Sequence, residues 1–275
     1  MSKALNKTWL AFAMLITTLA ASLVLATSAF AFSGPYIAKQ TEAGYNRNYV
    51  TIDYTKLDAL YSDDDCYNIK VTTYLYQKKG SGSWKKIKTL HNNGGNDYKY
   101  VTVKNLKPNT KYQYKVKSKV SYCIDEEIDV LDEDGYWVDY EYKTRTYSET
   151  TTSKAKTYWT ALKPYKGNRS SNTSFYWHTT KGAKGYVATA KVRLSVTWLG
   201  ITNSSNEIIA SDRKKKTSGS INGYVQFNYY GYPATATAKI KSTKIYPYTK
   251  HGSYYYSAGA PLKKSPKKLA NYYES

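Results

Sequence analysis

Apolar and polar residues alternate with a period of two along much of the chain. In the first half, Tyr112, Tyr114 and Val116 are separated by polar residues. In the second half, Ala234, Ala236 and Ala238 are separated by threonines. This period is typical of half-buried β-strands, whose successive side chains point to opposite faces. Long segments with a helical period are absent from the sequence, so we expect an all-β protein.

Turn residues between the alternating stretches divide the chain into predicted strands. In the first half, a strand within residues 32–44 is followed by strands over 49–54, 69–77, 84–90, 98–103, 112–124 and 146–157. In the second half, the pattern predicts strands over 175–178, 186–198, 207–210, 224–228, 234–245 and 253–256. The small alanines of 234–238 favour close packing against another sheet, so we expect a second β-rich domain, a sandwich.

The segment before Val116 has a more specific pattern. Leu106, Pro108, Thr110, Tyr112 and Tyr114 occur at every second position. Pro108 lacks a backbone donor and ends the preceding strand. The pattern resembles the E–F corner of a fibronectin type III module, here in a secreted and, we expect, bacterial protein. The resemblance covers about residues 35–157. It implies a β-sandwich in which the Tyr112 hydroxyl bonds to backbone upstream.

The N-terminus has the features of an export signal. Lys3 and Lys7 precede the uncharged run 8–32, and residues 29–31 read Ala-Phe-Ala, as at a signal-peptidase site. A transmembrane anchor is the alternative, but threonine and serine dilute the run. We therefore expect a signal peptide over residues 1–31 and a mature chain beginning at Phe32. No later stretch is apolar enough to span a bilayer, so the mature product is expected to be secreted, at the cell wall or in the extracellular space.

The remaining length is enough for two domains, which we place at 32–157 and 158–260, followed by a basic tail over 261–275. Residues 32–157 hold 20 Lys+Arg and 17 Asp+Glu, a net charge of +3. Residues 158–275 hold 19 Lys+Arg and 3 Asp+Glu, a net charge of +16. Such a field attracts anionic polymers and surfaces. Alternatively, the lysines keep a tyrosine-rich sheet protein soluble and protect its edges. The candidate polyanion-binding residues are Arg213, Lys214, Lys215, Lys216, Lys263, Lys264, Lys267 and Lys268.

Cys66 and Cys123 are the chain's 2 cysteines. An even cysteine count in an exported chain favours a disulfide. The fibronectin-type resemblance implies the same pairing, because Cys66 precedes strand C and Cys123 lies late in the neighbouring antiparallel strand F. Two reduced thiols or a metal-binding pair are the alternatives, and the pair lacks companion ligands for zinc.

An acidic insertion lies between predicted strands F and G. Residues 125–141 contain nine carboxylates and no cation, and Asp134–Gly135 indicates a two-residue hairpin turn. Part of the run is similar to the calcium-binding loop of an EF-hand, although Val130 occupies the position of the first acidic ligand of such a loop. A looser calcium site, a face for a basic partner and a merely solvated hairpin all remain open. The candidate site residues are Asp129, Asp132, Asp134, Asp139 and Glu141, with Asp63, Asp64 and Asp65 expected at the same end.

Motifs for catalysis are lacking. His91, His178 and His251 have no metal-ligand spacing, and no nucleophile elbow or phosphate-binding glycine loop occurs. Glu207 and Asp212 could form a glycosidase pair only if the fold brings them together. We therefore expect a noncatalytic binding or adhesion protein without a cofactor, calcium aside. Its basic half would contact an anionic cell-surface or matrix polymer, and no specific nucleic acid is expected. A self-assembling scaffold and a membrane-active toxin-like protein are the alternatives.

Overall fold

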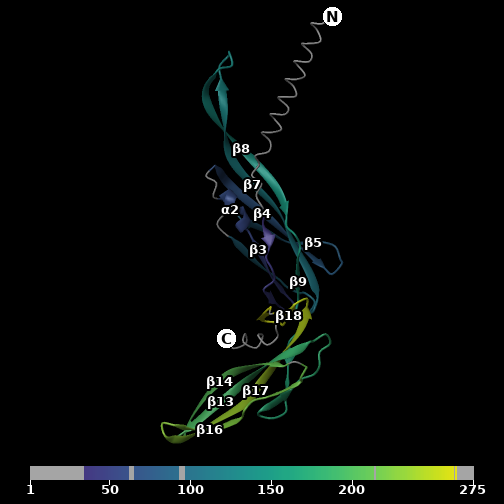
Figure 1. Ribbon diagram of the computed structural model, residues 1–275, viewed down its shortest axis with the longest axis vertical. Coiled ribbons are helices and arrows are strands. Elements are labelled where there is room, and N and C mark those ends of the chain that lie inside the picture. Colours follow the sequence, from purple (N-terminus) through teal and green to yellow (C-terminus); the bar gives the residue numbers. More distant parts are fainter. Residues whose placement is uncertain (1–33, 62–64, 93–96, 214, 263, 265–275) are drawn as a thin grey trace.

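The computed structural model describes residues 34–61, 65–92, 97–213, 215–262 and 264. These residues form an elongated molecule built almost wholly of antiparallel strands (Figure 1). Its helical turns are η1 (Thr55–Leu57) and α2 (Asp58–Tyr61). No helix within the described ranges has the length and apolar character needed to cross a membrane. The predicted all-β class is confirmed. The predicted signal peptide lies outside the described residues.

Two sheets form a sandwich in the first half. One sheet has the order β1-β3-β6, and the other has the order β5-β4-β7-β8, with β9 also pairing with β7. The strands are β1 (Tyr36–Ile37), β3 (Asn48–Asp53), β4 (Cys66–Lys79), β5 (Lys85–Asn92), β6 (Tyr98–Val103), β7 (Lys111–Leu131), β8 (Trp137–Thr152) and β9 (Lys156–Trp159). Apolar residues of both sheets meet in one core, which includes Ile52, Leu75 and Tyr114. The alternation that predicted the strands is therefore the alternation of core and solvent.

The corner at Pro108 forms as expected. The Lys107 backbone N–H donates to the Tyr112 hydroxyl over 2.9 Å, and the Tyr112 ring is buried. Asn109 takes a positive φ of 46°, a conformation that asparagine tolerates better than most residues. The predicted role of Tyr112 is confirmed, and the corner leads directly into β7.

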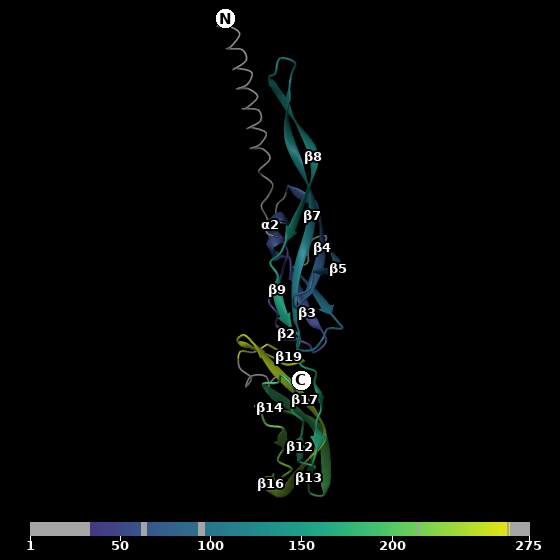
Figure 2. The same cartoon turned by 90° about the vertical axis from the view of Figure 1, so that its right-hand side faces the viewer.

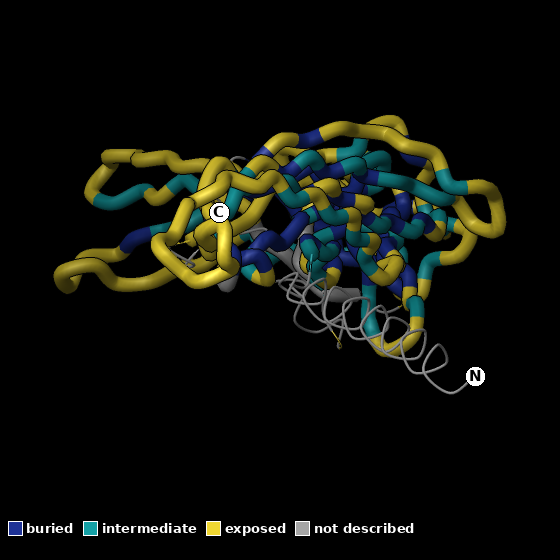
Figure 3. Tube along the Cα trace, turned by 90° about the horizontal axis from the view of Figure 1, so that it is seen from above, coloured by how far each residue is buried: buried dark blue, intermediate teal, exposed yellow. Residues whose placement is uncertain are grey.

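A second pair of sheets packs in the other half of the molecule. The larger sheet has the order β10-β17-β13-β14, with β16 and β18 also pairing with β17, and the smaller has the order β11-β12-β15. The strands are β10 (Tyr165–Lys166), β11 (Asn168–Arg169), β12 (Ser174–Tyr176), β13 (Gly185–Trp198), β14 (Ile201–Arg213), β15 (Ser218–Ser220), β16 (Tyr224–Tyr229), β17 (Tyr232–His251) and β18 (Tyr254–Tyr256). Phe175 and Trp177 pack over alternate residues of β13 and β17. Figure 3 shows buried segments inside the sheets and exposed segments along the projecting hairpins.

Several strands are longer than their sequence patterns predict. The range 207–210 is part of β14, which pairs with β13 over all 13 of its residues. The Ser- and Asn-rich start of β14 lacks apolar alternation because residues 201–208 are exposed. Likewise, 234–245 is the middle of the 20-residue β17. Pairing with a long neighbouring strand extends both elements beyond the part that the core selects.

The two halves meet at a joint where an early strand pairs with a late one. β2 (Glu42–Ala43) pairs with β19 (Ala260–Pro261), close to the point where β9 ends (Figure 2). Ala43, Ala161, Tyr256 and Ala258 form a buried cluster there. The predicted boundary after residue 157 falls inside β9, and the first residue of the predicted tail, Pro261, belongs to β19. The division into two domains stays a prediction.

His251 is the polar centre of this joint. Its ring stacks on Trp159 with centroids 3.5 Å apart, and its Nε2 lies 3.1 Å from the Asn109 side-chain oxygen. Asn109 belongs to the corner of the first sandwich and His251 ends β17 of the second. The corner therefore also serves as a contact surface between the two halves.

Candidate polyanion-binding surface

Cys66 and Cys123 are not joined by a disulfide, so the predicted bond is wrong. The predicted strand neighbours are correct, since β4 pairs with β7 near these residues. However, Cys66 is opposite Ile124, and Cys123 is opposite Tyr67. Because a one-residue offset reverses the face of a side chain, the two sulfurs lie on opposite faces of the sheet. Cys66 is buried in the core, whereas Cys123 is half-buried and contacts Thr146.

The acidic insertion forms the predicted β7–β8 hairpin, which projects from one end of the molecule (Figure 1). The turn differs from the prediction. The Asp132 N–H donates to the Tyr136 carbonyl, which leaves a three-residue loop, and Gly135 takes a φ of 84°. A type I turn followed by a left-handed glycine is a common hairpin loop. The Asp132 carboxylate accepts the N–H groups of Asp134 and Tyr136 and thereby closes the loop.

The hairpin distributes its carboxylates over two faces. Asp129 is opposite Tyr140, whereas Asp139 is opposite Val130 and Glu141 is opposite Ile128. Asp129 therefore points away from the face that Asp139 and Glu141 share. Among the residues that the structure describes, no three His, Cys, Asp or Glu residues form a group that could hold a metal ion. Asp65 is exposed at the start of β4, and Asp63 and Asp64 lie outside the described residues.

Hydrogen bonds and one ion pair stabilise the carboxylates near the base of the hairpin. Asp125 accepts hydrogen bonds from Thr144 at 2.5 Å and from Tyr67 at 2.7 Å. These two donors lower the pKa of the Asp125 carboxyl from its usual value. On the other face, Arg145 forms an ion pair with Glu126 at 2.5 Å. The base is thus a satisfied polar structure, and the carboxylates nearer the tip face solvent.

The basic residues singled out in the sequence are only partly described. Arg213 ends β14, and Lys215, Lys216 and Lys264 are exposed. Lys214, Lys263, Lys267 and Lys268 lie outside the described residues. Arg213, Lys215 and Lys216 lie in one stretch of the chain and Lys264 lies in another, and a polyanion-binding role for them stays a prediction.

A different set of cations lies together on the outer face of the larger sheet in the second half, the sheet that contains β13 and β17. We call this set the cation track, and it consists of Lys166, Lys191, Arg193, Lys239 and Lys244. All five residues are exposed. Arg193 is opposite Lys239, Lys191 is opposite Ser242, and Lys244 is opposite both Thr189 and Lys166. These pairs form three successive rows on one face. The rows are about 7 Å apart because they occur at every second residue of β13.

The core on the inner face holds the track in place. Ala190 and Val192 alternate with Lys191 and Arg193 along β13 and are buried against Phe175 and Trp177. On β17, a bulge at Lys241 keeps Lys239 and Lys244 on the same outer face. Burial of the small apolar residues therefore determines where the cations point.

The track brings like charges together without compensating acids. Arg193–Lys239 and Lys166–Lys244 are direct cross-strand pairs, an arrangement that destabilises a sheet. On β14, the neighbours of these rows are Asn206, Ile208 and Ala210. Within the part of the chain that the structure describes, the track's cations form no ion pair. An external anion would relieve this repulsion.

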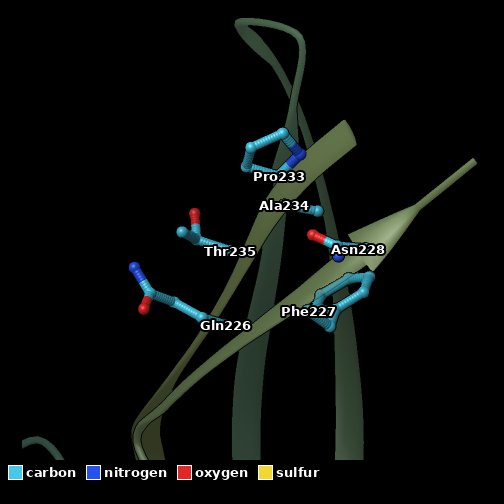
Figure 4. A pocket seen from close by; sticks show the side chains of 6 residues that line it. All are labelled: Gln226, Phe227, Asn228, Pro233, Ala234 and Thr235. Atoms are coloured by element: carbon cyan, nitrogen blue, oxygen red, sulfur yellow. The ribbon is translucent and has the colours of Figure 1, made fainter. Parts of the chain in front are cut away.

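Hydroxyl groups continue the same face toward the hairpin tips. Ser195 and Ser204 lie 2.9 Å apart, and Thr197 and Thr202 lie 2.8 Å apart, in successive rows of β13 and β14. A hollow of about 370 Å³ is lined by residues of β16 and β17. Gln226 and Thr235, two of these residues, project to the same side (Figure 4). The lining residues of the hollow carry no charge, so the cation track is the candidate site for an anion.

The residues considered for catalysis are not brought together. Glu207 and Asp212 lie on β14 opposite Val192 and Val187, five residues apart. This spacing corresponds to about 17 Å along a strand, beyond the separation of a glycosidase carboxylate pair. The three histidines have separate surroundings: His91 contacts Thr72, His178 stacks on Tyr165, and His251 stacks on Trp159.

The sequence did contain a signal for the track. The alternation around Ala236 and Ala238 assigns Lys239 to the solvent face, and buried Ala190 and Val192 assign Lys191 and Arg193 in the same way. What the pattern lacks is the register that places Arg193 beside Lys239 and Lys166 beside Lys244. Runs of adjacent lysines are conspicuous in a sequence, whereas cations gathered by strand pairing are not.

Comparisons with known proteins give little further information. No protein family model matches the chain, and no curated protein matches it. Among solved structures, a segment of two fibronectin type III domains from chicken tenascin is similar at 10% identity and a TM-score of 0.22. The match covers 85% of this chain and 99% of that segment. A TM-score this low does not establish a shared arrangement.

Proposed function

We propose that this chain is a noncatalytic, exported binding protein whose second half attaches to an anionic polymer of a cell envelope or extracellular matrix. The observation that carries the proposal is the cation track, with two like-charged cross-strand pairs and no carboxylate in its rows. Its linear arrangement, with rows about 7 Å apart, suits an extended chain of anionic groups. Hydroxyl ladders beside it offer further donors and acceptors to a sugar or polyol backbone.

The test is salt-dependent binding of the exported chain to immobilised polyphosphate and to a sulfated polysaccharide. Each cation that displaces condensed counterions adds about one unit to the slope of log affinity against log salt. Replacing Lys191, Arg193 and Lys239 by Gln should make this slope shallower by about two to three units. The matched control replaces three exposed lysines of β5, Lys85, Lys86 and Lys88, with Gln.

The control has the same net charge as the track variant and should bind as the wild type does. An equal loss in both triple variants would show that total charge alone matters and would reject the track as the site. Binding that ignores salt would reject the whole proposal, because binding of cations to a polyanion weakens steeply as salt is added.

A further inference from the structure

A basic groove of about 440 Å³ lies next to the cation track, between the β10–β11 segment and β17. Lys166, Arg169 and Lys241 line it together with Asn168 and Ser242. Three cations, an amide and a hydroxyl thus border one hollow, and its lining residues include no carboxylate.

The groove is formed by two local departures from regular strand structure. Lys191 is opposite Ser242 while Val192 is opposite Ile240, so Lys241 is the extra residue of a β-bulge. A bulge bends its strand and redirects the side chain. Across the groove, a Cβ on Gly167 would lie 2.7 Å from the Thr243 hydroxyl oxygen. Glycine therefore lets the β10–β11 segment approach β17 closely, with Lys166 and Arg169 on either side of it.

A hydrogen bond to the backbone of β17 holds the Arg169 side chain in position. One of its terminal nitrogens, Nη1, donates to the Ile240 carbonyl over 3.1 Å. A guanidinium has five N–H donors in a fixed plane, so this bond orients the group and leaves other donors for a ligand. Ile240 is itself anchored, because its N–H donates to the Asn172 carbonyl over 2.7 Å.

The charges of the groove favour an anion. Lys166 is directly opposite Lys244, and Lys241 follows closely after Lys239 on β17. The described residues of this half contain no ion pair that would neutralise them. A planar guanidinium between ammonium groups matches the charge and geometry of a tetrahedral oxyanion, which arginine binds through two parallel hydrogen bonds.

We propose that this groove binds a single tetrahedral oxyanion, a phosphate or sulfate group, contacted by Lys166, Arg169 and Lys241. The inference rests on the proposed function, since the oxyanion would be one substituent of the polymer that follows the track. The groove would then fix the position of the polymer, while the track supplies the less specific attraction.

The experiment titrates the exported chain with sodium sulfate and, separately, with inorganic phosphate, at an ionic strength kept constant with sodium chloride. Amide NMR shifts of Gly167 and Ser242 report on the groove. We expect saturable shifts in these residues, and replacing Lys166 and Lys241 by Gln should weaken the affinity about tenfold or more through loss of charge-assisted bonds. A preference for one of the two anions identifies the substituent.

The matched control replaces Lys85 and Lys86 by Gln, which removes the same charge from exposed positions of β5 in the other half and should leave the oxyanion affinity within about twofold, since screening limits the reach of exposed charges. Arg169→Lys keeps the charge but loses the planar fork, and it should also weaken binding. Chemical shifts that change linearly with the sulfate or phosphate concentration, without saturation, would overturn the inference. So would an equal loss of oxyanion affinity in both double variants.

The two proposals fail in different ways. If the polymer binds through the track but neither sulfate nor phosphate saturates the groove, this inference is wrong and the proposed function stands. If an oxyanion saturates the groove but no polymer is retained, the groove stands as a site for a small anion and the proposed function is wrong.

Discussion

Single residues decide how this tyrosine-rich protein uses its 32 tyrosines. Tyr114 lies in the core, and its hydroxyl accepts hydrogen bonds from the side-chain amides of Asn48 at 3.0 Å and Gln77 at 2.9 Å. Burial raises the pKa of Tyr114 to about 12 from its usual 10.0. Burial also raises the pKa of Tyr158, whose ring packs edge-on against Tyr114. The fold therefore favours the neutral phenols.

The raised pKa of Tyr114 predicts a loss of stability in alkali. Because the folded-state pKa exceeds the unfolded one, this contribution is complete below pH 10 and is lost as pH rises toward 12. Two pKa units correspond to about 3 kcal/mol of unfolding free energy. Urea unfolding curves recorded between pH 8 and 12 should show this fall in the unfolding free energy. The Tyr114→Phe variant should show a smaller fall over the same pH range.

Tyr100, which is 76% exposed, supplies the control for this experiment. Tyr100→Phe should follow the wild-type pH dependence. An equal fall in Tyr114→Phe and the wild type would mean that other groups, such as lysines, cause the alkaline loss.

At the scale of elements, the β7–β8 hairpin is the most unusual feature. Beyond its base it is a two-stranded ribbon exposed on both faces, and such hairpins are marginally stable in isolation. Tyr136 and Trp137 near its tip are 73% and 52% exposed. The carboxylate of Asp132 closes the loop by accepting two backbone N–H groups. Asp132 therefore has a structural role, and Asp129 points away from Asp139 and Glu141.

This arrangement predicts that calcium has no effect on the hairpin. Adding millimolar calcium or a chelator should leave the thermal midpoint of the exported chain unchanged. Replacing Asp132 by Ala should lower hairpin stability by about 1 kcal/mol, since it removes an acceptor for two N–H groups. Asp129→Asn, away from the loop, is the control. A calcium-dependent rise in the midpoint that Asp132→Asn abolishes would contradict this view.

At the scale of the whole molecule, the joint between the two sandwiches depends on His251. The ring stacks on Trp159, meets Tyr256 edge-on and lies beside Asn109. None of these neighbours carries a charge near neutral pH, and burial lowers the pKa of His251 from its usual 6.5. The neutral imidazole is thus the form that the joint accommodates.

The joint should therefore weaken in acid. A lowered folded-state pKa gives a contribution that is present above the unfolded value of 6.5 and lost as pH falls below it. Small-angle X-ray scattering should show a change in the arrangement of the halves between pH 7.5 and pH 5. His251→Phe, which keeps an aromatic ring, should make the profile independent of pH.

His178 is the matched control, because it also stacks on a ring but lies within the second half. His178→Phe should keep the wild-type pH response. Identical wild-type scattering at both pH values would show that His251 does not control the joint.

Features that depend on neighbours along the chain could be predicted from the sequence. Alternation placed most strands, including β6 at its observed bounds, and the resemblance of the segment around Pro108 to a fibronectin type III corner implied the bond to Tyr112. The excess of cations in the second half was also plain. These features are local, because a strand's two faces and a corner's geometry depend on residues a few positions apart.

The residues that face each other across strands became apparent only in the folded protein. Cys66 and Cys123 lie on paired strands, but an offset of one residue separates their sulfurs. Lys166 meets Lys244 and Arg193 meets Lys239 through pairings between segments far apart in the sequence. Register is determined by packing of both faces and by bulges such as that at Lys241, and it is not contained in the period of any single strand.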